Sequence, residues 1–329
     1  MALPTPLYAL VLEAGIRPTK AGDRFYYALL IKTNSGQIKA NMWDAHKEAA
    51  KDPDYPHVND VIKINKFKDQ LATHKSIVIS PLGFERIAKE DLPEDEKELC
   101  EFPKADPERL KWALKLISDK SLWEDEKHYN FVNKCLSKLD RNKLMSCPAA
   151  SAIHHNYSGG LLVHTAEVLD LCRAIYESCK EPYGFINRDV LYAGAILHDI
   201  GKVETYFITE AGLADQLATE QSIGHIFYGM DLVKNVGESE GIEQDFINEV
   251  IHLIASHHGK IEWGSYRPTQ SQEATILSSV DLISSRNGKI ESRLKENVKL
   301  GQPLRDSFDI YKDWYFASIG MKQYVEAAS

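Results

Sequence analysis

The first 80 residues alternate short apolar runs with polar turns. The runs are rich in β-branched and aromatic side chains, and turn sequences such as Asn34-Ser35-Gly36 separate them. Such runs are typical of β-strands. The pattern therefore predicts five strands, at residues 7–13, 25–32, 37–43, 60–66 and 76–80.

Five short strands suit a small barrel of the oligonucleotide-binding (OB) type. A longer polar insert, HKEAAKDPDYPHVND, precedes the fourth strand, as this architecture allows. A generic β-barrel or a small sandwich is the alternative interpretation. Either way, the pattern indicates an all-β domain over residues 1–90.

The pattern changes after this region. A charged, proline-punctuated stretch, KEDLPEDEKELCEFPKADPE, indicates a connector. Beyond it, apolar residues recur at helical spacing as far as about residue 285. We expect a multidomain α+β chain: the barrel at 1–90, a helical connector at 91–148, an all-α domain at 149–290 and an extension at 291–329.

Composition narrows the class of protein. The chain is 43% hydrophobic and 26% charged, which is ordinary for a globular protein, and it shows neither a signal peptide nor a membrane span. Five cysteines without a C-x-x-C pair indicate neither disulfides nor a cysteine zinc site. A cytoplasmic location is expected. Residues 1–90 carry a net charge of +3, whereas the whole chain carries -9. The N-terminal part is therefore mildly basic and the remainder of the chain acidic.

Histidines concentrate in the helical part and occupy inward positions. Eight of the twelve lie between residues 154 and 258. His164 falls on the apolar face of its predicted helix, and the pair His198-Asp199 lies at the end of another, AILHDIGK. The same inward pattern includes further residues, namely His225, His257, His258 and Asp281.

Such inward polar groups need compensation. Burying unpaired imidazoles and carboxylates costs several kcal/mol, roughly 2–7 for each neutral polar group. A metal centre removes the cost, since neutral imidazole and carboxylate are ligands of divalent transition metals. Seven donors are too many for one ion, so the set predicts two ions that share a carboxylate. Manganese, iron, cobalt, nickel or zinc would suit them better than magnesium or calcium.

These residues resemble a known family. His164, His198-Asp199 and Asp281 match the H…HD…D signature of HD-domain metal-dependent phosphohydrolases. The ordered motifs PAASAIHHNYSGGLLVHTAEV, AGAILHDIGK, GHIFYG, ASHHGKIEWGS and QEATILSSVD resemble the YhaM family of 3′-5′ exoribonucleases, which carry an OB barrel ahead of the HD domain. GQIKANMWDA is similar to the barrel segment of that family.

The resemblance implies a ligand set. One ion would take His164, His198, Asp199 and Asp281. The other would take Asp199, His225, His257 and His258, so that Asp199 bridges. Two divalent ions, manganese before iron, cobalt, nickel or zinc, would then activate a water for attack on phosphorus.

Other residues near the motifs have expected roles. Lys202 would stabilise charge on the phosphate, the alternative being an exposed lysine favoured by the helix dipole. His154 and His155 would contact the scissile phosphate or protonate the leaving oxygen, the alternative being capping or packing. For Glu167 and Glu204 we expect solvated helix faces. His252 is expected to be structural.

The barrel has residue types that hold single strands. Aromatic rings stack bases, and basic side chains follow phosphates. The aromatic candidates are Tyr26, Tyr27, Trp43 and Phe67, and the basic ones are Lys32, Lys39, Lys63, Lys66 and Lys68. In EWGSYRPTQ, Tyr266 and Arg267 depart from the pattern of the family, and Arg267 joins the candidate nucleic-acid contacts.

The expected function is metal-dependent 3′-5′ hydrolysis of single-stranded RNA, with single-stranded DNA as a further substrate. Two alternatives stay open at this point. One is a nucleotidase or cyclic-nucleotide phosphodiesterase that uses the same ions, and the other is a catalytically silent RNA-binding scaffold. Single-stranded nucleic acid is the expected partner, a membrane is not, and the aromatic C-terminal stretch allows a homo-oligomer.

Overall fold

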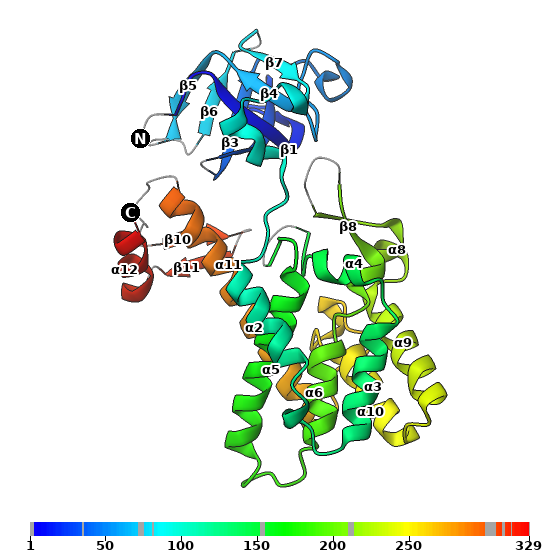
Figure 1. The fold of residues 1–329 in the computed structure, drawn as a ribbon. Helices are drawn as coiled ribbons and strands as arrows, with labels where there is room; N and C mark the ends of the chain where they lie inside the picture. The colour runs from blue at the N-terminus through cyan, green and yellow to red at the C-terminus, as the bar shows by residue number, and fades with distance from the viewer. Residues whose placement is uncertain are drawn as a thin grey trace. The chain divides into compact units, whose positions relative to one another are not determined.

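The computed structural model describes most of the chain. The described residues are 3–34, 36–71, 76–80, 82–151, 155–209, 214–299, 307–310, 313–316 and 318–328. The chain divides into two compact units, one formed by Met1–Glu101 with Ser292–Ser329 and the other by Phe102–Glu291 (Figure 1). The domain boundaries that the sequence predicts, at residues 90, 148 and 290, stay a prediction.

The N-terminal unit is built on one curled sheet. Its strands are β1 (Leu7–Pro18), β2 (Phe25–Thr33), β3 (Gly36–Trp43), β4 (Val61–Ile64), β5 (Phe67–Gln70), β6 (Ser76–Ile79) and β7 (Phe84–Ile87). The strand order is β5-β6-β3-β2-β1-β4-β7. All pairs are antiparallel except β3 with β6.

The expected fold class, an OB-type β-domain followed by a helical domain, is confirmed, with the β-domain present as a curled sheet. The predicted number of strands is wrong. The five predicted strands correspond to β1, β2, β3, β4 and β6, and the sheet has seven. The missed strands, β5 and β7, form its edges and read FKDQ and FERI. Each presents exposed polar residues at its centre. No run of apolar residues therefore marks them in the sequence.

Side chains alternate across this sheet. In β2 the buried positions are Tyr27, Leu29, Ile31 and Thr33, while Tyr26 and Lys32 are only partly buried. This period of two is the signature of a strand with one face in the core. It places Tyr26 and Lys32 on the outer face of the sheet.

The second unit is a bundle of helices. Those that surround its core are α2 (Pro107–Ile117), α3 (Glu126–Ser137), α4 (Arg141–Ser146), α5 (Gly160–Cys179), α6 (Arg188–Leu197), α9 (His225–Glu240), α10 (Gln244–Ser256) and α11 (Gln272–Lys299). The shorter helices are α7 (Lys202–Thr205) and α8 (Ala218–Ser222). Side-chain oxygens of Asp106, Asp125, Asp140 and Asn187 cap four of the helix starts.

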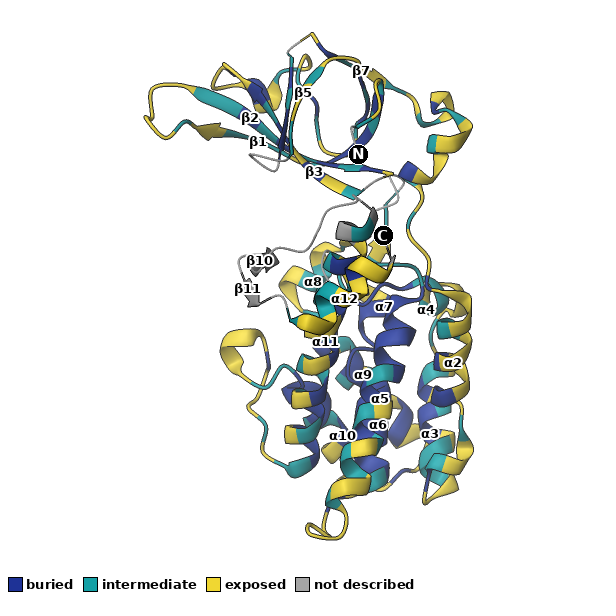
Figure 2. Ribbon diagram, turned by 90° about the vertical axis from the view of Figure 1, so that its left-hand side faces the viewer, coloured by how far each residue is buried: buried dark blue, intermediate teal, exposed yellow. Residues whose placement is uncertain are grey.

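Helices α5 and α6 lie at the centre of this unit (Figure 2), and α6 is buried from Asp189 to its end at Leu197. The sequence predicts an all-α domain here, but the unit also contains strands. A hairpin of β8 (Tyr206–Ile208) and β9 (Ala214–Gln216) follows α7. A second hairpin, β10 (Ser307–Ile310) with β11 (Asp313–Phe316), and helix α12 (Ile319–Ala328) belong to the C-terminal segment.

A close approach of two helix ends positions the predicted HD pair. Helix α6 ends at Leu197, and His198 and Asp199 lie in the turn before α7. A Cβ atom at Gly201 would lie only 2.0 Å from the carbonyl oxygen of His225, the first residue of α9. Glycine therefore lets α9 pack onto this turn and brings His225 near Asp199.

Candidate metal centre

The structure brings all seven predicted metal ligands together. They come from five places: helix α5, the turn after α6, the start of α9, the end of α10, and α11. These predicted ligands are His164, His198, Asp199, His225, His257, His258 and Asp281. Within the described residues they form two groups, in each of which the possible donor atoms all lie within 4.8 Å of one another.

The first donor group consists of His164, His198 and Asp281. The Nε2 atom of His164 lies 3.3 Å from Nε2 of His198 and 3.1 Å from Oδ1 of Asp281. Both histidines are fully buried. Three donor atoms therefore converge between two buried rings and a carboxylate whose side chain is 16% exposed.

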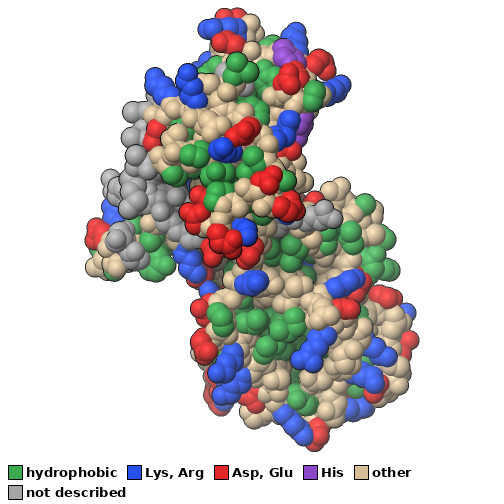
Figure 3. Space-filling model, turned by 45° about the horizontal axis from the view of Figure 1, so that its top comes forward, with side chains coloured by type: hydrophobic (Ala, Val, Ile, Leu, Met, Phe, Trp, Pro, Cys, Tyr) green, Lys and Arg blue, Asp and Glu red, His purple; other side chains and the backbone are tan. Residues whose placement is uncertain are grey.

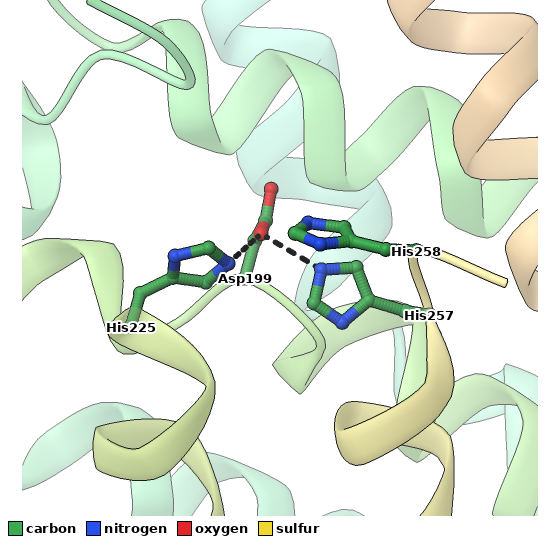
Figure 4. A group of neighbouring side chains, drawn as sticks. All are labelled: Asp199, His225, His257 and His258. Atoms are coloured by element: carbon green, nitrogen blue, oxygen red, sulfur yellow. Dashed lines mark ion pairs between the residues drawn. The ribbon is translucent and has the colours of Figure 1, made fainter. Parts of the chain in front are cut away.

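The second donor group consists of Asp199, His225, His257 and His258 (Figure 4). Oδ1 of Asp199 lies 3.4 Å from Nε2 of His225 and 3.4 Å from Nε2 of His257. The ring of His258 lies 4.2 Å from that of His257 and 5.5 Å from that of His225. The three rings thus surround one carboxylate oxygen.

The carboxylate of Asp199 faces both groups. Its Oδ1 atom points to the second group, while Oδ2 lies 3.4 Å from Nε2 of His198 and 3.6 Å from Nε2 of His164. The side chain is 3% exposed. A carboxylate in this position could bind one ion with each oxygen.

The outer ring nitrogens assign the tautomers of four histidines. The Nδ1 atom of His198 lies 3.0 Å from the Ala195 carbonyl oxygen, and that of His257 lies 2.7 Å from the Ile254 carbonyl oxygen. The Nδ1 atom of His225 lies 2.6 Å from a carboxylate oxygen of Glu220. Each of these partners is an acceptor, so the proton is assigned to Nδ1.

The same holds for His164. Its Nδ1 lies 3.0 Å from Oγ of Ser284, and that hydroxyl donates its proton to Glu167 at 2.8 Å. The hydroxyl oxygen therefore accepts from His164 Nδ1. With the Nδ1 protons assigned in this way, the four Nε2 atoms face one another or carboxylate oxygens. Such an arrangement requires either a cation or added protons between them.

The unsatisfied polar atoms fit a metal. Each member of the second donor group has a buried atom without a hydrogen-bond partner in the described part of the chain: Asp199 Oδ1, His225 Nε2, His257 Nε2 and His258 Nδ1. An unmade hydrogen bond of this kind costs about 1–3 kcal/mol. Imidazole and carboxylate donors without thiolates suit Mn, Fe, Co, Ni or Zn. The residues present therefore fit a divalent transition metal.

Three imidazoles and the Asp199 carboxylate have pKa values shifted in the direction that a cation site requires, whereas Asp199 outweighs burial and raises the pKa of His198. Burial lowers the pKa of His164 and His225, and it lowers the pKa of His258 to about 3 with help from His257. Burial alone would raise the pKa of Asp199, but the Lys202 ammonium and nearby imidazoles hold it well below its usual range. Asp199 is therefore charged and the three rings are neutral, as metal ligands must be.

Lys202 is part of this centre. Its ammonium donates to Oδ2 of Asp199 at 2.6 Å and to the Ala149 carbonyl at 2.8 Å, and the residue is 7% exposed. The pKa of this ammonium is raised, because the charge of Asp199 outweighs burial. The alternative of an exposed lysine at a helix end is therefore wrong.

His155 lies behind the first donor group and not in it. Its ring is 5.3 Å from that of His164, and its Nε2 lies 3.0 Å from Oε2 of Glu167. It is 2% exposed. The expected contact with the scissile phosphate stays a prediction, and His154 lies outside the described residues.

The expectation of a solvated Glu167 is wrong. Its carboxylate pairs with Arg109, accepts from Ser284, and has a side chain 19% exposed. Arg109 also contacts both carboxylate oxygens of Glu291 at 3.0 and 3.2 Å. Burial would raise the pKa of Glu167, yet His155 and Arg109 lower it to about 2. Glu204 is exposed, as expected.

Sequence analysis missed three residues that hold the ligands: Glu167, Ser284 and Glu220. One signal was available, because Glu167 follows His164 by three positions on the same helix. Ser284, 120 residues from His164, leaves no local signal. His252, expected to be structural, accepts from the backbone N–H of Gln270 at 3.1 Å and lies outside both donor groups.

The predicted nucleic-acid contacts of the N-terminal unit differ in their exposure. Tyr26 and Trp43 form a cross-strand pair with ring centroids 5.0 Å apart, and Trp43 is 47% exposed. Lys39 is exposed on the same face of β3. Tyr27 is a core residue whose hydroxyl donates to the Pro56 carbonyl, and Lys32 donates to the Glu101 carbonyl at 3.1 Å.

The remaining candidates are scattered. Lys66 and Lys68 are exposed, Phe67 packs partly against the barrel core, and Lys63 pairs with Glu85 at 2.7 Å. Arg267 is exposed in the helical unit, in the loop after α10. Basic and acidic side chains are both present on the face seen in Figure 3, and acidic ones gather near its middle.

Comparison with known proteins agrees with this centre. A family model described as HD domain matches residues 161–286. Three similar curated proteins are each named 3′-5′ exoribonuclease YhaM. That of Oceanobacillus iheyensis is 30% identical over 297 residues, 89% of this chain and 87% of the relative. Those of Geobacillus sp. (over 89% and 86%) and Listeria welshimeri (over 87% and 87%) are 27% identical. No solved structure matches significantly.

The fold and the match define an HD-domain protein, and the matched residues include every predicted metal ligand. At this identity and coverage, the chain belongs to the YhaM family. The expected family and the expected enzyme class, a hydrolase, are confirmed. In the described part of the chain, no helix combines the length and the apolar character that crossing a membrane requires.

Proposed function

We propose that the chain is a metal-dependent exoribonuclease that shortens single-stranded RNA from its 3′ end, with single-stranded DNA as a further substrate. The observation that carries the proposal is the convergence of imidazole nitrogens and carboxylate oxygens in two donor groups, in each of which all members but one are buried. The names of the curated relatives support the direction and the substrate.

Each donor group is proposed to hold one divalent ion, manganese first and iron, cobalt, nickel or zinc as alternatives. His164, His198 and Asp281 would bind one ion, and His225, His257 and His258 the other, with Asp199 shared. Ions held in this way supply Lewis acidity and lower the pKa of a bound water. Buried surroundings strengthen such electrostatic effects.

Lys202 is proposed to contact the phosphate. An ammonium has three donors, and Asp199 and Ala149 take two of them. The third could donate to a phosphoryl oxygen as negative charge builds there. His155 is proposed to help through Glu167, which it holds in place behind His164.

The barrel is proposed to hold the strand. The Tyr26–Trp43 pair offers an exposed aromatic surface, and Lys39 lies on the same outer face of the sheet. Stacking of this kind tolerates any base sequence. Arg267 in the helical unit, and Lys66 and Lys68 near β5, are further candidates for phosphate contacts.

The test uses the purified full chain with Mn²⁺. A 5′-labelled single-stranded RNA is incubated beside mono- and cyclic nucleotides, with chelator and the Asp199→Asn variant as controls. A ladder that shortens from the 3′ end only when metal is present supports the proposal. Turnover of small nucleotides alone favours the nucleotidase alternative, and binding without any turnover favours the silent scaffold.

A further inference from the structure

The loop after α10 folds back on the helix that precedes it. Its turn is closed by a hydrogen bond from the Ser265 N–H to the Lys260 carbonyl at 3.2 Å. The N–H groups of Tyr266 and Arg267 then donate to the carbonyl of Ala255 at 2.9 and 3.2 Å. The loop is therefore tied by backbone hydrogen bonds to the last turn before His257 and His258.

The loop reaches the second donor group at His258. Gly264 has φ +96°, and a Cβ there would lie 3.3 Å from Nδ1 of His258. This nitrogen is the atom of the His258 ring that has no hydrogen-bond partner in the described part of the chain. Two residues later, the Tyr266 hydroxyl donates to the carbonyl of Ile223. Ile223 is two residues before His225. One side chain thus spans the two segments that present His258 and His225.

The Tyr266 ring is held at both ends and still open to solvent. Its backbone is bonded to α10 and its hydroxyl to Ile223, yet the residue is 44% exposed. A ring that only locked the loop would be expected to bury its faces. An aromatic ring fixed in advance loses little conformational freedom when a flat ligand stacks on it.

We propose that Tyr266 is a stacking platform for the base of the 3′-terminal nucleotide, an inference that rests on the proposed function. Every nucleobase has a π-face, so such a platform accepts any base but requires one. Arg267 follows directly and is exposed, where a guanidinium can contact a neighbouring phosphate. Tyr266 therefore sets a specificity of the centre: it selects a nucleotide with a base over a bare sugar phosphate.

The test compares two RNA oligonucleotides that differ only in the last nucleotide, one carrying adenine and the other abasic. The wild-type chain should show a KM about 5- to 150-fold lower for the adenine end, the range expected for loss of one stacking contact. Tyr266→Leu should lose this preference. Tyr266→Phe, which keeps the ring, should retain it. Tyr183→Leu, at another exposed tyrosine of the helical unit, is the matched control and should behave as wild type.

An equal preference in wild type and Tyr266→Leu would overturn the inference. If the wild-type chain shortens neither oligonucleotide, the proposed function itself fails, so the two failures are distinct. A second measurement needs no stable variant: a 3′-terminal 2-aminopurine should lose fluorescence when the oligonucleotide binds the wild-type chain in chelator. Unchanged fluorescence of the bound terminal base would also overturn the inference.

Discussion

The ammonium of Lys202 lies 2.6 Å from Oδ2 of Asp199, and both side chains are less than a tenth exposed. The same Asp199 carboxylate faces two groups of imidazoles, and the Lys202 ammonium is paired with it directly. Burial of a charge is tolerated only with such a partner. This pair therefore links the stability of the helical unit to the occupancy of the metal centre.

Asp199→Asn should remove metal and activity together. The amide cannot supply the negative charge that both donor groups share. We expect bound Mn²⁺, measured by elemental analysis after dialysis, to fall, and RNA hydrolysis to drop more than about 100-fold, the upper range for loss of residues that merely support a ligand. Asp231→Asn, at an exposed position of α9, should leave both unchanged. Full metal content in Asp199→Asn would contradict the assignment.

Lys202→Met should destabilise the metal-free chain and be rescued by metal. Removal of one partner of a buried ion pair costs about 3–5 kcal/mol, because the other charge stays buried. Mn²⁺ should restore much of the lost free energy of unfolding, since a bound cation replaces the ammonium. Urea denaturation with chelator and with Mn²⁺ measures both values. Equal stabilisation of variant and wild type by Mn²⁺ would refute this, and Lys143→Met is the exposed control.

Glu167→Gln should weaken metal binding without removing a ligand. The carboxylate orients the Ser284 hydroxyl, which in turn accepts from Nδ1 of His164. Loss of such an outer partner costs about 10–100-fold in metal affinity or activity. Titration of the metal-free chain with Mn²⁺ measures the affinity directly. Glu204→Gln, at an exposed glutamate, should bind Mn²⁺ as wild type does.

His258 should contribute a rise in the stability of the metal-free chain with pH between about 5 and 6.5. The pKa of His258 is about 3 in the folded chain against 6.5 for an ordinary histidine, so in this interval the unfolded chain binds the extra proton. At 1.36 kcal/mol per pH unit, this contributes about 2 kcal/mol, and the contribution is constant above pH 6.5. Urea denaturation of His258→Gln in chelator should show a smaller slope than wild type. Identical slopes would show that His258 is not buried in its neutral form.

Trp43→Ala should weaken binding of single-stranded RNA about 5- to 150-fold, the range for one lost base stack. The Trp43 ring is 47% exposed and paired with Tyr26. Fluorescence anisotropy at a stated salt concentration measures the affinity. Val58→Ala, at an equally exposed apolar residue of the same unit, is the control. Unchanged affinity in Trp43→Ala would remove this face of the sheet from the proposed interface.

Much of the fold was visible in the sequence because hydrophobic periodicity is local. The alternation in β2 and β3 and the helical spacing beyond residue 105 each record which face of an element is buried. The edge strands β5 and β7 were missed because their central residues are polar and exposed, so their sequences show no alternation of buried and exposed positions. The hairpin β8–β9 was missed as well, inside a region expected to be purely helical.

The sequence by itself determined which side chains of the centre point inward, because an imidazole or carboxylate on an apolar helix face is recognisable from spacing alone. Only the tertiary structure decided which of them meet: that Oδ1 and Oδ2 of Asp199 face different groups, and that Ser284 holds a histidine 120 positions away. The physical reason is that hydrogen bonding and metal binding depend on separations of 2–4 Å between atoms, and packing sets these between segments that the chain itself keeps far apart.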